Sequence, residues 1–173
     1  MGIRFVLALI FCCAAAPVQA QGISDLKSHD VDQPFDISAD KVEVQDQNNI
    51  AVFSGNVAVE QGDLSLKAKT LRVFYERQGT AAPTILRLDA RGTVALTSPS
   101  ETVTGAWSIY DVRREIVTVG GNVRFQSADA RLAGDRLELN LRSGLTTLDS
   151  DDVGTGPKQR VKGRFAVPDK TGG

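Results

Sequence analysis

Apolar side chains recur at every second position through residues 50–75, IAVFSGNVAVEQGDLSLKAKTLRVFY. A period of two places such side chains on one face of an extended strand, whereas a helix needs spacings of three and four. Two glycine pairs, Gly55-Asn56 and Gly62-Asp63, interrupt the alternation, and both are suited to tight turns with positive φ. The stretch therefore predicts three short antiparallel strands in a meander.

The same pattern returns in residues 116–141, and a weaker copy lies between the two. Gly55-Asn56-Val57 corresponds to Gly92-Thr93-Val94 in the middle copy and to Gly121-Asn122-Val123 in the last. The prolines after residue 20 fall between or at the ends of the apolar runs, where a missing N–H costs no ladder bond. Because such modules bury apolar surface only against their neighbours, we predict an all-β single domain built from stacked strand modules.

The first 20 residues have the pattern of a cleaved signal peptide. Arg4 precedes an apolar run over residues 5–16, which is too short to span a bilayer that requires roughly 20 apolar residues. Cys12 and Cys13 both lie in this segment, so the exported chain would contain no cysteine. We therefore expect an exported protein without disulfides.

The chain after the signal peptide divides into three expected segments. We expect residues 21–34 to be a flexible lead-in, residues 35–168 to be the β-domain, and residues 169–173 to be a disordered tail. The lead-in carries the only histidine, His29, and no other metal-ligating residues cluster near it. No metal site is predicted.

The residue types that perform catalysis are not grouped in this sequence. There is one histidine, there is no cysteine after Cys13, and the pair Gly120-Gly121 is followed by a strand rather than by the helix of a nucleotide-binding loop. The aspartates sit at turns or strand ends, where they cap turns. A formal net charge of −1 argues against nucleic acid as a partner. We predict neither an enzyme nor a cofactor.

Positive charges alternate with other residues near the C-terminus. In an extended conformation, one side would carry the four basic side chains Lys158, Arg160, Lys162 and Arg164. This pattern suits a solvated tail or a lysine-guarded edge strand. It also suits a contact for phosphates, or an edge strand that pairs with a partner. Phe165 and Val167 favour some ordered strand here.

The interior of such a folded sheet is either a packed core or a lined groove. Aliphatic side chains dominate the apolar positions, and these suit alkyl chains as well as an ordinary core. The alternation of apolar residues is compatible with both a packed core and a lined groove.

Several short motifs follow one another along the chain. They are Asp32-Gln33-Pro34, Phe35-Asp36-Ile37-Ser38-Ala39-Asp40, Phe53-Ser54-Gly55-Asn56-Val57, Gln61-Gly62, Gly121-Asn122-Val123 and Leu132-Ala133-Gly134-Asp135. In this order and spacing, the motifs resemble the OstA-like family of periplasmic lipopolysaccharide-transport bridges. The likeness covers roughly residues 32–148, and residues 160–168 are similar to that family's last strand.

The resemblance implies an open, twisted antiparallel β-jellyroll, shaped like a folded taco, that holds the acyl chains of lipopolysaccharide in its interior. It also implies head-to-tail stacking with further copies and with LptC-like inner-membrane and LptD-like outer-membrane jellyroll proteins, in the periplasm. The alternative is a structural β-stacking protein of the envelope that carries no lipid.

The alternation, combined with the family's inward face, predicts which residues line the interior. A register slip of one residue would reverse the face. The expected lining residues are Phe35, Ile37, Val57, Val59, Leu64, Leu66, Leu71, Val73, Tyr75, Val94, Leu96, Tyr110, Val112, Val123, Phe125, Leu137, Leu139 and Leu141. The edges expected to pair with neighbours by strand addition contain Phe35 and Ile37 at one end and Val161, Phe165 and Val167 at the other.

Overall fold

The computed structural model describes residues 29–150 and 160–166, and these form one antiparallel sheet of ten strands. The elements are β1 (Asp36–Ser38), β2 (Lys41–Gln45), the 3-10 helix η2 (Asp46–Asn48), β3 (Ile50–Gln61), β4 (Leu64–Glu76), β5 (Thr84–Thr97), β6 (Glu101–Asp111), β7 (Ile116–Ser127), β8 (Ala130–Asn140), β9 (Thr146–Asp149) and β10 (Lys162–Phe165). The prediction of an all-β antiparallel fold is confirmed.

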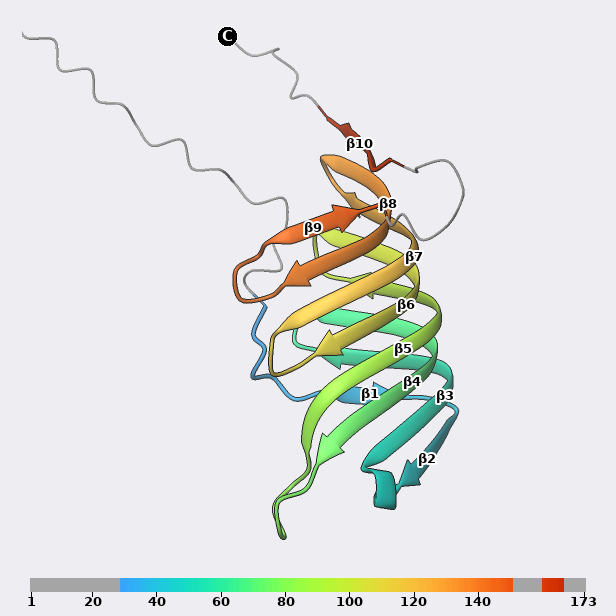
Figure 1. Ribbon diagram of the computed structural model, residues 1–173, viewed down its shortest axis with the longest axis vertical. Helices are drawn as coiled ribbons and strands as arrows, with labels where there is room; N and C mark the ends of the chain where they lie inside the picture. The colour runs from blue at the N-terminus through green and yellow to red at the C-terminus, as the bar shows by residue number, and fades with distance from the viewer. Residues whose placement is uncertain (1–28, 151–159, 167–173) are drawn as a thin grey trace, which may run out of the picture.

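From β3 to β8, neighbouring strands in the sequence are also neighbours in the sheet, whose order is β1-β3-β4-β5-β6-β7-β8-β10. β1 and β2 both pair with β3, and β9 and β10 both pair with β8. These two pairs of short strands therefore form opposite ends of the sheet, and Figure 1 shows them at opposite ends of its long axis. The sheet does not close on itself.

The long strands bend near their middles. Three pairs of consecutive residues in β3, β5 and β7 have positive φ, and the register with the following strand shifts at each pair. The pairs are Gly55 (φ +78°) and Asn56 (φ +44°), Gly92 (φ +83°) and Thr93 (φ +57°), and Gly121 (φ +82°) and Asn122 (φ +53°). Each is a β-bulge, which redirects a strand without reversing it.

The sequence correctly predicted positive φ at Gly55-Asn56 but was wrong to interpret this pair as a turn. The pair lies inside a continuous strand, so residues 50–76 form two long strands instead of three short ones. Gly62, with φ +53°, does lie in the turn between β3 and β4. A tight turn and a β-bulge give the same local sequence pattern, because both require residues that tolerate positive φ.

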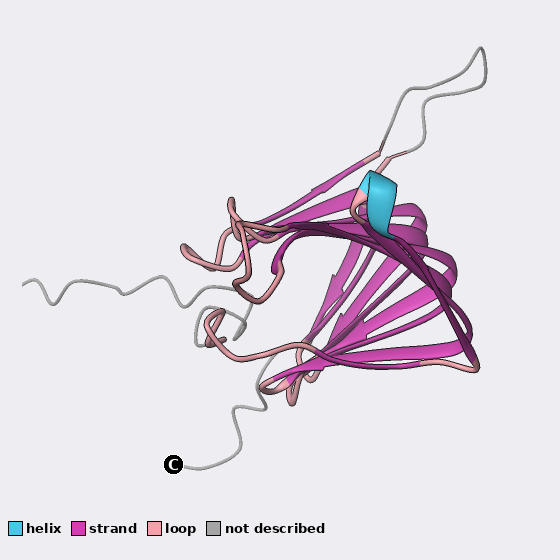
Figure 2. Cartoon of the chain, turned by 90° about the horizontal axis from the view of Figure 1, so that it is seen from below, coloured by secondary structure: helices cyan, strands magenta, loops and turns pink. Residues whose placement is uncertain are grey.

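The bends line up across the sheet. The pairs in β3, β5 and β7 each lie beside a single residue of an adjacent strand: Lys69 in β4, Ala106 in β6 and Asp135 in β8. At the β1 end, Asp40 accepts a hydrogen bond from the Asn56 amide at 2.9 Å. The whole sheet therefore folds along one line into the shape of a wedge, with most of its loops on the open side (Figure 2).

Replacing Gly121 by alanine should destabilise this fold line. A Cβ there would lie 2.7 Å from the Ala106 Cβ, and the φ of +82° is already unfavourable for a residue with a side chain. We expect Gly121→Ala to lower the free energy of unfolding by about 2–4 kcal/mol in urea titrations.

The matched control is Gly79→Ala. Gly79 also has positive φ, +58°, but its Cβ would have no heavy atom within 4 Å. This variant should lose only about 1 kcal/mol. Equal losses in the two variants would contradict the importance of the close approach to Ala106.

Candidate functional site

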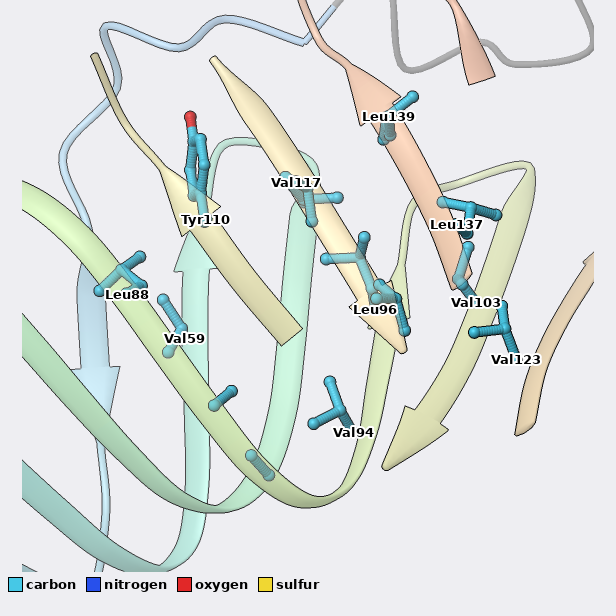
Figure 3. Close-up of a cluster of buried hydrophobic side chains, with 14 of the residues drawn as sticks. Val59, Leu88, Val94, Leu96, Val103, Tyr110, Val117, Val123, Leu137 and Leu139 are labelled. Atoms are coloured by element: carbon cyan, nitrogen blue, oxygen red, sulfur yellow. The ribbon is translucent and has the colours of Figure 1, made fainter. Parts of the chain in front are cut away.

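The inner face of the folded sheet carries the buried apolar side chains (Figure 3). Of the eighteen residues predicted to line the interior, fourteen are at most 7% exposed. The other four, Phe35, Ile37, Leu66 and Val112, are partly buried and pack against the same cluster. The structure thus brings all eighteen to the interior, and their contact with a ligand stays a prediction.

Directly opposed side chains form an uninterrupted apolar row across this face. Each residue of the row is the cross-strand partner of the next, and only the final position lacks a side chain. The row is Ile37, Val59, Leu66, Leu96, Val103, Phe125, Leu132 and Gly163. Cross-strand partners share a face, so the row runs from β1 at one end of the sheet to β10 at the other.

Several interior residues were not predicted from the sequence. Leu88, Ala90, Val103, Val117 and Val119 are all at most 3% exposed. A pattern repeated around Gly55, Gly92 and Gly121 could have found four of them. The residues two and four positions before each of these glycines face inward, and so do the residues two and four positions after it. In β7, Val117 and Val119 precede Gly121, and Val123 and Phe125 follow it.

A buried glutamine ties the N-terminal segment to the end of β3. The Gln61 amide nitrogen donates to the carbonyl oxygens of Val31 at 2.8 Å and Gln33 at 3.0 Å. Its oxygen lies 3.1 Å from His29 Nε2 and accepts from the Tyr110 hydroxyl at 3.4 Å. The described part of the predicted lead-in, from His29 onward, is therefore held against the sheet.

The interior next to this network is nearly filled. Phe35 meets Tyr110 edge-to-face with ring centroids 5.9 Å apart. Beside them lies a cavity of about 30 Å³, which also contacts Val59, Leu88 and Val117. This is room for one or two water molecules. An acyl chain could enter here only if the two arms of the wedge separated.

The basic side chains of β10 face away from the interior of the wedge. Lys162 and Arg164 of β10 pair with Ala133 and Arg131 of β8, whose neighbour Leu132 faces the interior, so these two basic side chains face outward. Contact of Arg160, Lys162 or Arg164 with phosphate stays a prediction.

The structure describes some of the predicted edge and basic residues and not others. Phe165 shares the inner face and is 59% exposed at the end of the sheet. Arg160 and Val161 are exposed and precede β10. Lys158 and Val167 lie outside the described residues.

Two other features are absent from residues 29–150 and 160–166. No group of three or more His, Asp or Glu side chains there could hold a metal ion. In the same residues, no helix has the length and apolar character needed to cross a membrane.

Replacing Gln61 by leucine should loosen the N-terminal segment. The change leaves the carbonyls of Val31 and Gln33 without their donor, which costs about 1–3 kcal/mol of unfolding free energy. Hydrogen exchange in residues 31–35 should accelerate. The control Gln126→Leu changes an exposed glutamine and should leave both measurements unchanged. Unchanged exchange in Gln61→Leu would contradict this role.

The Tyr110 phenol should stay protonated well above pH 10. Burial, and to a smaller extent the negative charge of Glu115, raises the pKa of Tyr110 from 10.0 to about 12. Stability from this group is full below pH 10 and is lost as the pH rises to about 12, because the folded state then binds more protons than the unfolded state. In Tyr75→Phe, whose only tyrosine is Tyr110, ultraviolet titration should give this midpoint. A folded-state midpoint near 10 would contradict it.

The fold is also found among solved structures. The crystal structure of LptH from Pseudomonas aeruginosa, described as the LptA homologous periplasmic component of the lipopolysaccharide transport device, superposes with a TM-score of 0.69 at 18% identity. The match covers 80% of this chain and 99% of that chain. The expectation of an open antiparallel jellyroll is confirmed.

Sequence comparisons identify relatives of the chain. It is 32% identical to an uncharacterized protein of Rhizobium meliloti over 124 residues, which cover 69% of this chain and 67% of the relative. It is 27% identical to the lipopolysaccharide export system protein LptA of Escherichia coli over 143 residues, covering 79% and 72% of the two chains. The family described as LptA/(LptD N-terminal domain) LPS transport protein matches residues 36–145. The chain belongs to this family of lipopolysaccharide transport proteins.

Proposed function

We propose that the protein is a periplasmic bridge that carries lipopolysaccharide from the inner to the outer membrane. The acyl chains would occupy the apolar interior, and the jellyroll would stack head-to-tail with further copies and with LptC-like and LptD-like jellyroll proteins. The observation that carries the proposal is the apolar row from Ile37 to Gly163, which reaches both ends of an open sheet. A pocket for a single small ligand would not need to run the length of the sheet.

Burial of acyl chains supplies enough free energy for this role. Each methylene removed from water contributes about 0.8 kcal/mol, so a chain of about a dozen carbons contributes on the order of 10 kcal/mol before other terms. An exposed charge pair contributes at most about 1 kcal/mol. The interior would therefore supply the affinity, and any polar contact would mainly orient the lipid.

The small cavity favours a second candidate, a structural protein that stacks without lipid. Around this cavity of about 30 Å³, near Phe35 and Tyr110, the interior side chains pack against one another as in an ordinary core. The two functions differ in one respect. A carrier must admit a chain between side chains that otherwise touch, whereas a structural module keeps them together.

Photo-crosslinking to lipopolysaccharide in cells separates these functions. A photoreactive residue at Val73, which is 4% exposed on the inner face, should form lipid adducts. The matched control is the adjacent position Arg72, whose guanidinium lies over the Phe74 ring on the other face. Adducts at neither position, in protein shown to be folded and exported, would overturn the carrier proposal and leave the structural one.

A further inference from the structure

A second row of directly opposed residues crosses the outer face of the sheet and is charged only at its ends. It begins with two carboxylates in β1 and β3 and ends with two guanidinium groups in β8 and β10. The row is Asp36, Glu60, Ser65, Thr97, Thr102, Gln126, Arg131 and Arg164. One edge of the sheet is thus acidic in this row, and the other edge is basic.

Each end of this row places like charges opposite each other, which is unfavourable within one chain. Asp36 faces Glu60, and Arg164 faces Arg131. The ion pairs found in the described part of the chain involve none of these four residues. An opposite charge beyond either edge would relieve the repulsion.

A third row, on the other side of the fold line, has the reverse polarity. It starts with a lysine in β2 and ends with an aspartate in β9. The row is Lys41, Ser54, Thr70, Arg91, Trp107, Gly120, Arg136 and Asp149. The two edges are therefore complementary at two positions and with opposite signs.

The strand directions permit a second copy to continue the sheet. Seven successive antiparallel pairings separate β1 from β10, and an odd number makes these two strands antiparallel to each other. β10 of one copy can therefore pair with β1 of the next in the same antiparallel manner. The same relation holds for β9 and β2.

We propose that charge pairing between two copies of this chain sets the register of their end-to-end stack. Arg164 of one copy lies opposite Asp36 of the next, and Asp149 lies opposite Lys41. This inference rests on the head-to-tail stacking of the proposed function and adds the residues that align it.

Apolar contact follows from the same alignment. Val42, which is 53% exposed, belongs to the inner-face row that ends at Leu148, so Leu148 of the preceding copy would cover it. The inner row from Ile37 to Gly163 would also continue into the next copy. The stack therefore extends the apolar interior without a polar break.

Displaced registers are less favourable. A slip of two residues keeps each side chain on its face but changes its partner. In one direction, Asp149 meets Glu43 of the next copy, and like charges oppose each other. In the other direction, Asp149 meets Ala39, and Arg164 loses Asp36. Joining two identical edges would bring Asp36 toward Asp36, so the charges also favour head-to-tail polarity.

Charge reversal tests the pairing. Asp36→Lys and Arg164→Glu should each raise the dissociation constant for self-association, measured by sedimentation, on the order of 2- to 30-fold, because an exposed attraction becomes a repulsion. The double variant carrying both changes should return to near the original value. The original protein should also dissociate more readily at high salt.

Two controls separate assembly from folding. Asp36→Lys would face Glu60 and Arg164→Glu would face Arg131, so each single variant should keep or raise the melting temperature. Arg114→Glu makes the same change in charge as Arg164→Glu but in the turn between β6 and β7, away from both edges, and should leave association unchanged.

Each outcome has one meaning. If both single variants self-associate as tightly as Arg114→Glu, charge pairing does not set the register of the stack. The proposal of head-to-tail stacking would be unaffected. If the single variants weaken self-association and the double variant does not restore it, Arg164 does not pair with Asp36. The basic edge would then contact another anionic group. No self-association by the original protein at any concentration would overturn both this inference and the proposed stacking of copies, while lipid adducts at Val73 would still support the carrier.

Discussion

The fold depends on the alignment of its bends. Neighbouring strands are hydrogen-bonded along their lengths, so a strand cannot change direction unless its neighbours change direction at the same level. Positive-φ pairs in β3, β5 and β7 supply the change on every second long strand, and single residues of the strands between them accommodate it. This alignment turns a flat sheet with one apolar face into a wedge whose apolar face meets itself.

Much of this could be predicted from the sequence because it depends on local patterns. The alternation of apolar residues identified the strands, and Gly55-Asn56, which recurs as Gly92-Thr93 and Gly121-Asn122, was predicted to have positive φ. The distinction between a turn and a bulge was not predictable in this way. It depends on whether the next segment pairs with the preceding one or with other strands, and Gly55-Asn56 has the same local chemistry in both cases.

The remaining features depend on contacts between distant residues. The hydrogen bonds of Gln61 to Val31 and Gln33 join positions about thirty residues apart, and no periodic pattern marks them. The charged rows are less accessible still, because the position of Arg164 relative to Asp36 depends on seven strand registers, several of them shifted at a bulge. A single error in register would move a residue to a different row or face.

In the proposed bridge, equivalent apolar interiors in successive copies would favour transfer over storage. Without lipid, the apolar side chains of the two arms contact one another, and with lipid they would contact the acyl chains. The gain of an acyl chain relative to water is on the order of 10 kcal/mol, so loss of the lipid to the aqueous phase would be strongly disfavoured. Movement from one copy to the next would exchange equivalent apolar surroundings, and the free-energy difference between identical sites is zero. A ligand with equal affinity for two sites favours neither. Such a stack would keep the lipid from water without setting its direction, which partners at the two ends would have to impose.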